Sequence, residues 1–228
     1  MSAVTKQGLM SLCHPPLRPQ EELHLFMVPA IPGDNISNAT NTPGSEHFMY
    51  FAYGSNLLRE RLQLNNPSAG FVSTGCLKDW VIKFGYWNKE LNNSWHGGVA
   101  TIEESKEDVV WGVVWKMDKD HLITLDRQEG VGKGLYSPFN VTVNTEDGEV
   151  VCRTYKMNNF TVHLTSPQYK QVVCLGAKQS GLPLDYIKKL EAVETNDYSG
   201  PSILDDITAL KPSEKEKDLE MLPDKVQH

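Results

Sequence analysis

The tetrapeptide Tyr53-Gly54-Ser55-Asn56 interrupts an apolar, aromatic run and is followed directly by LLRERL. A strand that turns on small residues into a helix lets a ligand approach the unpaired N–H groups of the helix start. Such a cradle suits a carboxylate or a developing oxyanion. Ser and Asn are also good N-cap residues, so a plain strand-to-helix turn explains the same pattern.

Ser55 is a weak candidate for a catalytic nucleophile. The elbow of a serine hydrolase reads G-x-S-x-G, whereas Tyr53 and Leu57 stand where the two glycines belong. No His or acidic residue completes an evident triad in the sequence. The turn therefore either binds an anion through its backbone or only ends a strand.

Glu129, in the stretch LDRQEGV, is placed in the last turn of a predicted helix, just before Gly130. A carboxylate at this position faces the negative end of the helix dipole. Partial burial would raise its pKa, which suits a group that transfers protons near neutral pH. The alternative interpretation is an exposed Glu beside a C-capping glycine.

Tyrosines supply a third hint, because Tyr136, Tyr155 and Tyr169 each lie in an apolar segment and carry a polar tip. They could line a pocket for a small polar ligand, although buried tyrosines often only bond to backbone. The four cysteines, Cys13, Cys76, Cys152 and Cys174, form no CxxC pair and have no His at metal-ligand spacing. We therefore expect the reduced thiols of a cytosolic protein, no metal and no cofactor.

Several elements must position these residues. Apolar and alternating runs predict strands, whereas helical periodicity with Asp118 as N-cap and Gly130 as terminator predicts a helix. Ser166-Pro167 starts another helix that ends at Gly181, and Pro183 starts a third. The predicted strands are FMYFAY, LKDWVIKFGYW, GGVATIEES, VVWGVVWKM and a hairpin that turns at Asp147-Gly148. The sum is an α+β domain with a strongly curved, mainly antiparallel sheet or small barrel.

Composition bounds the domain organisation and the function class. The 228 residues are 39% hydrophobic and carry a net charge of −7, which predicts one sizeable domain and disfavours nucleic acid or an anionic membrane as partner. No apolar run approaches a membrane span, and Glu21-Glu22 stand where a signal peptide would be basic. We expect a disordered extension over residues 1–45, the folded domain over 46–200 and a charged, loosely ordered tail over 201–228.

Taken in order, several sequence blocks resemble the γ-glutamylcyclotransferase family of vertebrates. The blocks are YFAYGSNLL, NPSA, WHGGVATI, VWGVVWKM, LDRQEGV, CRTY, SPQYKQVVCLGAK and GLPLDY. They cover the chain from about Phe48 to Gly200. The resemblance implies a small β-barrel flanked by helices, a homodimer, and an enzyme that converts γ-glutamyl amino acids to 5-oxoproline and the free amino acid.

The resemblance also implies roles for individual residues. Glu129 would be the proton-transfer residue, Tyr169 would contact the substrate, and Tyr136 and Tyr155 would line the same cavity. The substrate loop would comprise Tyr50, Phe51, Ala52, Tyr53, Gly54 and Ser55, and the cradle of N–H groups predicted from the residues adds Asn56 as a substrate-binding candidate. Arg127 departs from the family pattern, where an acidic residue is expected, and leaves the local charge open. The competing readings are a glutathione-specific or γ-glutamylamine cyclotransferase and a non-catalytic γ-glutamyl-binding relative.

Overall fold

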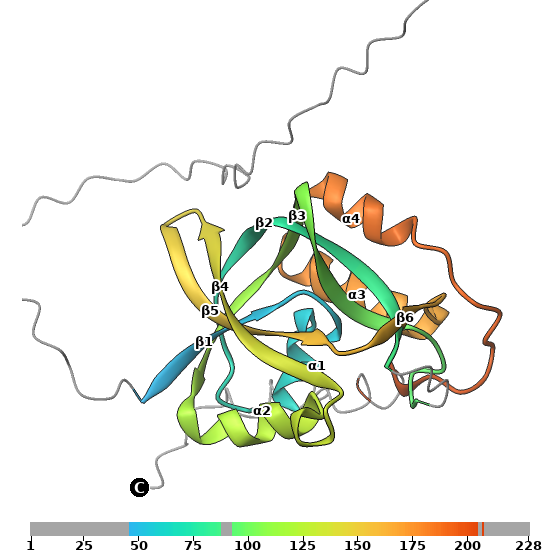
Figure 1. Ribbon diagram of the computed structural model, residues 1–228, viewed down its shortest axis with the longest axis horizontal. Helices are drawn as coiled ribbons and strands as arrows, with labels where there is room; N and C mark the ends of the chain where they lie inside the picture. The colour runs from blue at the N-terminus through green and yellow to red at the C-terminus, as the bar shows by residue number, and fades with distance from the viewer. Residues whose placement is uncertain (1–45, 88–92, 205–206, 208–228) are drawn as a thin grey trace, which may run out of the picture.

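The computed structural model describes residues 46–87, 93–204 and 207 (Figure 1). The predicted N-terminal extension and nearly all of the predicted C-terminal tail lie outside these residues, as does Cys13. Within the described ranges, no helix is both long enough and apolar enough to span a membrane.

The strands close into a barrel, which confirms the predicted fold class. The sheet order is β3-β1-β5-β4-β2-β6, and an additional pairing of β2 with β3 closes it. All pairings are antiparallel except the one between β1 and β5. The strands are β1 (His47–Ala52), β2 (Gly70–Trp87), β3 (Val99–Asp118), β4 (Tyr136–Thr145), β5 (Gly148–Met157) and β6 (Phe160–Val162).

The long strands β2 and β3 form most of the barrel wall. The sequence predicted GGVATIEES and VVWGVVWKM as separate strands, whereas β3 runs through both without interruption. The polar stretch between them is largely exposed and still pairs with β2, for instance Trp80 with Glu104. Polarity therefore marks a part of the strand that leaves the core, not a break in the ladder.

The helical segments follow the predicted start and stop signals with one exception. The hydroxyl of Ser166 accepts a hydrogen bond from the Tyr169 N–H at 3.2 Å, so Ser166 caps α3 as expected. Asp118 makes no capping hydrogen bond; it ends β3, and its carboxylate lies 2.7 Å from His47 Nδ1. The segments are η1 (Ser55–Leu57), α1 (Arg59–Gln63), η2 (Lys119–His121), α2 (Leu122–Gln128), η3 (Val131–Lys133), α3 (Pro167–Gln179) and α4 (Leu184–Glu191).

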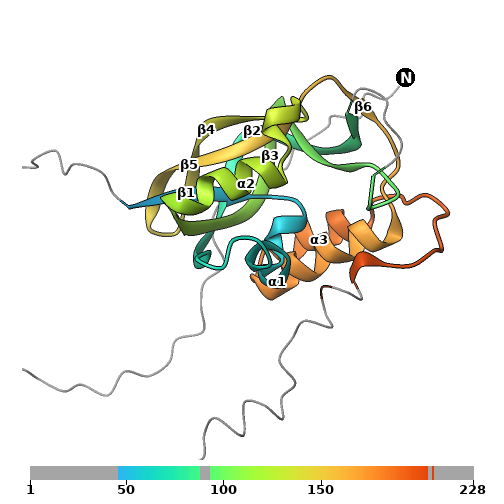
Figure 2. The same ribbon diagram turned by 90° about the horizontal axis from the view of Figure 1, so that it is seen from below.

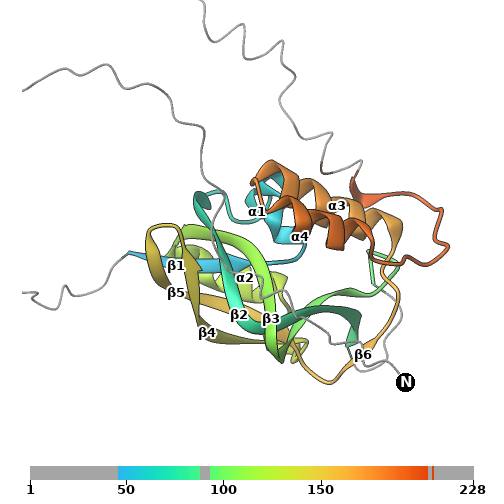
Figure 3. The same ribbon diagram turned by 90° about the horizontal axis from the view of Figure 1, so that it is seen from above.

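Two groups of helices hold the turn after β1 and the end of α2 near each other. Figures 2 and 3 show α1 and α3 together on one side of the barrel. A side chain at Gly176 of α3 would come within 2.3 Å of the Leu58 N atom, so the glycine lets α3 pack directly on this turn. A hydrogen bond from Asn66 Nδ2, just after α1, to Gln128 Oε1 of α2 at 3.1 Å ties the end of α2 to this region.

Candidate active site

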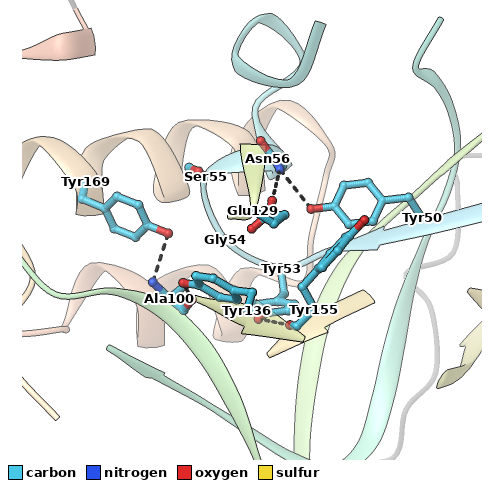
Figure 4. A pocket seen from close by; sticks show the side chains of 10 residues that line it. All are labelled: Tyr50, Tyr53, Gly54, Ser55, Asn56, Ala100, Glu129, Tyr136, Tyr155 and Tyr169. Carbon is cyan, nitrogen blue, oxygen red and sulfur yellow. Dashed lines mark hydrogen bonds between the residues drawn. The ribbon is translucent and has the colours of Figure 1, made fainter. Parts of the chain in front are cut away.

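A small cavity opens to solvent at the turn between β1 and α1. Its wall combines segments that are far apart in the sequence: β1, the turn, β3, the end of α2, β4, β5 and α3. Figure 4 shows these side chains converging on one space. The lining residues are Tyr50, Tyr53, Gly54, Ser55, Asn56, Ala100, Glu129, Tyr136, Tyr155 and Tyr169.

The structure brings together nearly all of the residues that the sequence singled out. Phe51 and Ala52 are the two candidates that do not line the cavity. Phe51 is fully buried in the core, where its ring packs beside Gly112 and its carbonyl accepts a hydrogen bond from Thr154 Oγ1 at 2.9 Å. Successive residues of a strand point to opposite faces, so Phe51 points away from the face that carries Tyr50.

Glu129 follows α2 as its C-cap residue, and Gly130 then adopts a left-handed conformation with φ 66° that ends the helix. The Glu129 carboxyl lines the cavity and accepts a hydrogen bond from Asn56 Nδ2 at 3.0 Å. Burial raises the pKa of Glu129 to about 7, and the charge of Asp126 acts in the same direction. Arg61 and the Asn56 hydrogen bond lower the pKa but do not offset burial. The expected rise in pKa is confirmed, with burial as its leading cause.

A chain of side-chain amides fixes the orientation of Asn56. Gln128 Nε2 donates to Asn56 Oδ1 at 2.8 Å, and Asn66 Nδ2 donates to Gln128 Oε1 at 3.1 Å. With its oxygen occupied, the Asn56 amide must direct its hydrogens outward, and Nδ2 lies 3.0 Å from both Tyr50 Oη and Glu129 Oε1. One carboxylate oxygen of Glu129 is thereby held by a neutral donor.

Three of the cavity tyrosines donate their hydroxyl hydrogens to protein acceptors. Tyr53 donates to the Tyr155 carbonyl at 2.5 Å, and Tyr136 donates to the Ala100 carbonyl at 2.8 Å. Tyr155 donates to Asp126 Oδ1 at 2.5 Å. These three side chains therefore form part of the cavity wall and have no hydroxyl hydrogen left to donate to a ligand.

The remaining cavity tyrosines are arranged differently. Tyr50 Oη accepts from Asn56, and Tyr169 Oη accepts from the Ala100 N–H at 3.0 Å (Figure 4). Within the described part of the chain, the Tyr50 hydroxyl has no protein acceptor for its own hydrogen and can donate into the cavity, whereas Tyr169 Oη also hydrogen-bonds with the side chain and backbone of Ser55. Burial raises the pKa of both tyrosines, which therefore stay protonated near neutral pH.

Gly54 permits the close approach of α3 to the turn. A methyl group at this position would lie 3.1 Å from both Tyr169 Oη and Ala100 Cβ. After it, the first backbone hydrogen bonds of the turn are donated by Leu57 to Gly54 and by Leu58 to Ser55. The N–H groups of Ser55 and Asn56 precede these bonds, at the point where the turn borders the cavity.

Sequence reasoning missed Ala100 and the polar residues behind the wall. Ala100 contributes through its backbone, which bonds to Tyr136 and Tyr169, and a backbone role leaves no mark on residue type. Asp126 and Gln128 belong to the stretch LDRQEGV quoted above. Arg153 lies on β5, distant from that stretch in the sequence, and contacts Asp126 only in the folded barrel. Among the described residues, no group of three His, Cys, Asp or Glu side chains could hold a metal ion, and Cys76, Cys152 and Cys174 form no disulfide.

Comparisons with known proteins identify the family. The AIG2-like family model matches residues 109–190. A Bos taurus protein named gamma-glutamylcyclotransferase is 56% identical over 156 residues, which are 68% of this chain and 83% of that protein. The Homo sapiens protein of the same name is 52% identical over 159 residues, 69% of this chain and 85% of that protein.

A solved structure of a gamma-glutamyl cyclotransferase is also similar. It is 50% identical, with a TM-score of 0.70 over 72% of this chain and 99% of that one. The similarity therefore spans the barrel, the turn after β1 and the end of α2, which together form the cavity. The chain belongs to the gamma-glutamylcyclotransferase family.

Proposed function

We propose that the chain is a cyclotransferase that converts γ-glutamyl amino acids to 5-oxoproline and the free amino acid. The observation that carries this proposal is the Glu129 carboxyl, which faces the cavity with a pKa of about 7 and is held by Asn56 of the YGSN turn. A carboxyl with this pKa both accepts and returns a proton near neutral pH.

The reaction needs no nucleophile from the protein. The substrate's own α-amine attacks its γ-carbonyl carbon, a new C–N bond closes a five-membered lactam, and the C–N bond to the second amino acid breaks. Holding the substrate in the ring-closing conformation makes proximity the main catalytic resource, and such intramolecular effects are worth roughly 7–11 kcal/mol. A small cavity walled by tyrosine rings suits this folding of the substrate.

Glu129 moves the protons. The substrate's α-ammonium has a reference pKa of about 8 and must lose a proton before attack. Ionised Glu129 accepts that proton and then delivers it to the nitrogen of the departing amino acid as the tetrahedral intermediate collapses. The excess proton of the ring nitrogen leaves through the same carboxylate and protonates the released amine, so the reaction consumes no net proton.

Neutral hydrogen-bond donors of the cavity stabilise the negative charge on the substrate oxygens. The N–H of Asn56 and the hydroxyl of Tyr50 border this space, beside Ser55 and Tyr169, which hydrogen-bond to each other. The Asn56 and Tyr50 donors bind the α-carboxylate of the glutamyl group or the oxyanion that develops on the γ-carbonyl. Tyr53, Tyr136 and Tyr155 shape the ring-closing conformation.

The test is an assay of 5-oxoproline after incubation with γ-glutamyl-alanine, glutathione and γ-glutamyl-lysine separately. We expect γ-glutamyl-alanine to react far faster than glutathione. A tenfold preference for glutathione, about 1.4 kcal/mol in transition-state binding, would overturn the substrate assignment. No 5-oxoproline from any of the three substrates would favour the non-catalytic reading.

We also expect the family assembly, a homodimer in the cytosol, and activity without any cofactor. Light scattering of the purified chain measures the assembly directly, and fractionation of cells measures the location. Treatment with a chelator should leave the rate unchanged, and recovery of a lost rate on addition of a metal would contradict this expectation.

A further inference from the structure

The cavity carries less positive charge than its proposed substrate requires. A γ-glutamyl dipeptide has two carboxylates and one ammonium, whereas Glu129 is the only charged side chain among the cavity-lining residues that the structure describes. The neutral donors of the turn serve one carboxylate. A cation for the other carboxylate must come from just outside the lining.

Arg153 does not supply that cation. Its Nη2 bonds to both carboxylate oxygens of Asp126, at 2.7 and 2.9 Å, and its Nε donates to Tyr155 Oη at 2.9 Å. Turning Arg153 toward a substrate would break an ion pair and release Tyr155. The Arg153 guanidinium is therefore occupied by Asp126 and Tyr155 and is not available to bind a substrate carboxylate.

Arg61 is a second arginine near the cavity, and it pairs with no acidic side chain among the described residues. Its Cζ stands 5.9 Å from the centroid of the Trp95 ring, and that ring packs edge-on against Tyr169 at 5.0 Å. Tyr169 lines the cavity. Trp95 therefore contacts both the Arg61 guanidinium and a residue of the cavity wall. Within the described ranges of the chain, Arg61 makes no ion pair or hydrogen bond, which leaves its guanidinium donors open.

Arg61 also acts on the cavity from the side of Glu129. Among charged groups it has the largest effect on the Glu129 carboxyl, yet the two side chains do not form an ion pair. The guanidinium is thus close to the reacting region without being neutralised by the catalytic carboxyl. Stacking on Trp95 holds it there at little cost, because a cation over an aromatic face keeps its N–H edge free.

We propose that Arg61 binds the carboxylate of the departing amino acid and thereby selects γ-glutamyl dipeptides with a free carboxylate next to the scissile bond. This inference rests on the proposed function. The glutamyl α-carboxylate shares its carbon with the amine that must reach Glu129, and the Asn56 N–H of the turn is at hand for it. The second carboxylate extends toward Arg61, which is half-buried and so borders both the site and solvent.

The proposal gives a chemical reason for discrimination against other γ-glutamyl compounds. In glutathione, the carboxyl next to the scissile bond is an amide, and the free carboxylate lies one residue farther away. In γ-glutamyl amines, this carboxylate is missing. Bidentate pairing of a guanidinium with a carboxylate is specific in geometry, so neither compound satisfies Arg61 in the same place.

The test compares two substrates that differ by this carboxylate alone. Removal of the carboxylate from γ-glutamyl-alanine leaves γ-glutamyl-ethylamide. We expect kcat/KM of the parent to favour γ-glutamyl-alanine by at least tenfold, and Arg61→Gln to reduce that ratio to less than threefold by slowing γ-glutamyl-alanine alone. Rates are compared on the alkaline plateau, where Glu129 is ionised in both proteins and the effect of Arg61 on its protonation drops out.

Controls separate this role from others. Arg59→Gln removes an exposed cation from the same helix outside the cavity and should leave the ratio unchanged. Arg61→Lys retains the charge without the planar fork and should keep part of the preference. Equal slowing of both substrates in Arg61→Gln, or no slowing of either, overturns the proposal. If the parent forms no 5-oxoproline from either substrate, the proposed function itself fails, and this result is distinguishable from an active parent with an unchanged ratio.

Discussion

Two carboxylates near the end of α2 have opposite surroundings. Asp126 is clamped by both oxygens against Arg153 and accepts a hydrogen bond from Tyr155. Glu129, one turn later, has a single amide donor and faces the cavity. Figure 4 shows Glu129 beside Asn56, with the tyrosine wall below.

The difference separates a structural carboxylate from one suited to proton transfer. The Asp126 carboxylate is paired with the Arg153 guanidinium and does not line the cavity. A buried carboxylate with only neutral donors pays for desolvation, and its pKa rises toward neutrality, as that of Glu129 does. Asp126 contributes to that rise through its own negative charge while keeping Tyr155 in place.

Glu129→Gln should produce the largest effect. The change preserves shape and removes the titratable proton carrier, so turnover should fall by at least the roughly 10²–10⁴-fold typical of a lost general acid–base group. Substrate should still bind, since the donors of the turn and the tyrosines remain. A 5-oxoproline assay measures the loss of turnover, and calorimetry measures the retained substrate binding. If the variant keeps more than about a tenth of the parent activity, Glu129 is not the proton carrier.

Gln128→Met tests whether the amide chain matters to Glu129. The change leaves Asn56 Oδ1 buried without its donor, which should cost about 1–3 kcal/mol of stability. The Asn56 amide is then less firmly directed at Glu129, so we expect the acidic limb of the pH–rate profile to move to higher pH. Gln179→Met on α3, outside the cavity, is the matched control. An unmoved limb would mean that Asn56 keeps its orientation without Gln128.

The stability of the parent should fall as the pH rises through the titration of Glu129. A carboxyl whose pKa rises on folding binds more protons in the folded state, so stability is lost between its ordinary pKa and about 7. The open cavity moderates the desolvation penalty, and we expect a loss of about 1–2 kcal/mol. Glu129→Gln should therefore be more stable than the parent at pH 8 and similar at pH 5, as measured by thermal unfolding. A constant difference between the two proteins at both pH values would contradict this linkage.

Asp126→Asn should have the smallest effect. Both partners of the Asp126–Arg153 pair are partly exposed, with 29% and 24% of their side-chain surface accessible, so we expect a stability loss of about 1 kcal/mol. Removal of its negative charge should lower the pKa of Glu129 and move the acidic limb to lower pH. A loss of turnover as large as that of Glu129→Gln would remove the distinction between the two carboxylates.

Local chemistry was enough to predict most of the elements. Ser166 caps α3, Gly130 ends the region of α2, and Gly148 with φ 116° lies at the turn of the hairpin. These signals depend on a few neighbouring residues, whose hydrogen bonds and backbone angles are set within one turn. Glu129 and the Tyr53–Asn56 turn were recognisable for the same reason, because each combines unusual residue types within a short segment.

Short-range sequence signals did not predict which residues of the contiguous substrate loop line the cavity. The motif includes Phe51 and Ala52 as readily as Tyr50, but neither lines the cavity, and strand alternation turns Phe51 into the core. Continuity of β3 through its polar stretch was likewise decided by pairing with β2. In both cases the partners lie far along the chain, so composition alone carries no signal of them.

The sequence by itself determined the family, the α+β class, the turn and the candidate proton carrier, because each depends on residue type and short-range order. Tertiary structure decided which side chains share a cavity, why the pKa of Glu129 approaches neutrality, and that Arg61 lies beside Trp95 without an ion pair among the described residues. These properties depend on burial and on the distances between groups separated by many residues. Only closure of the barrel, with α1, α2 and α3 packed around it, sets those distances.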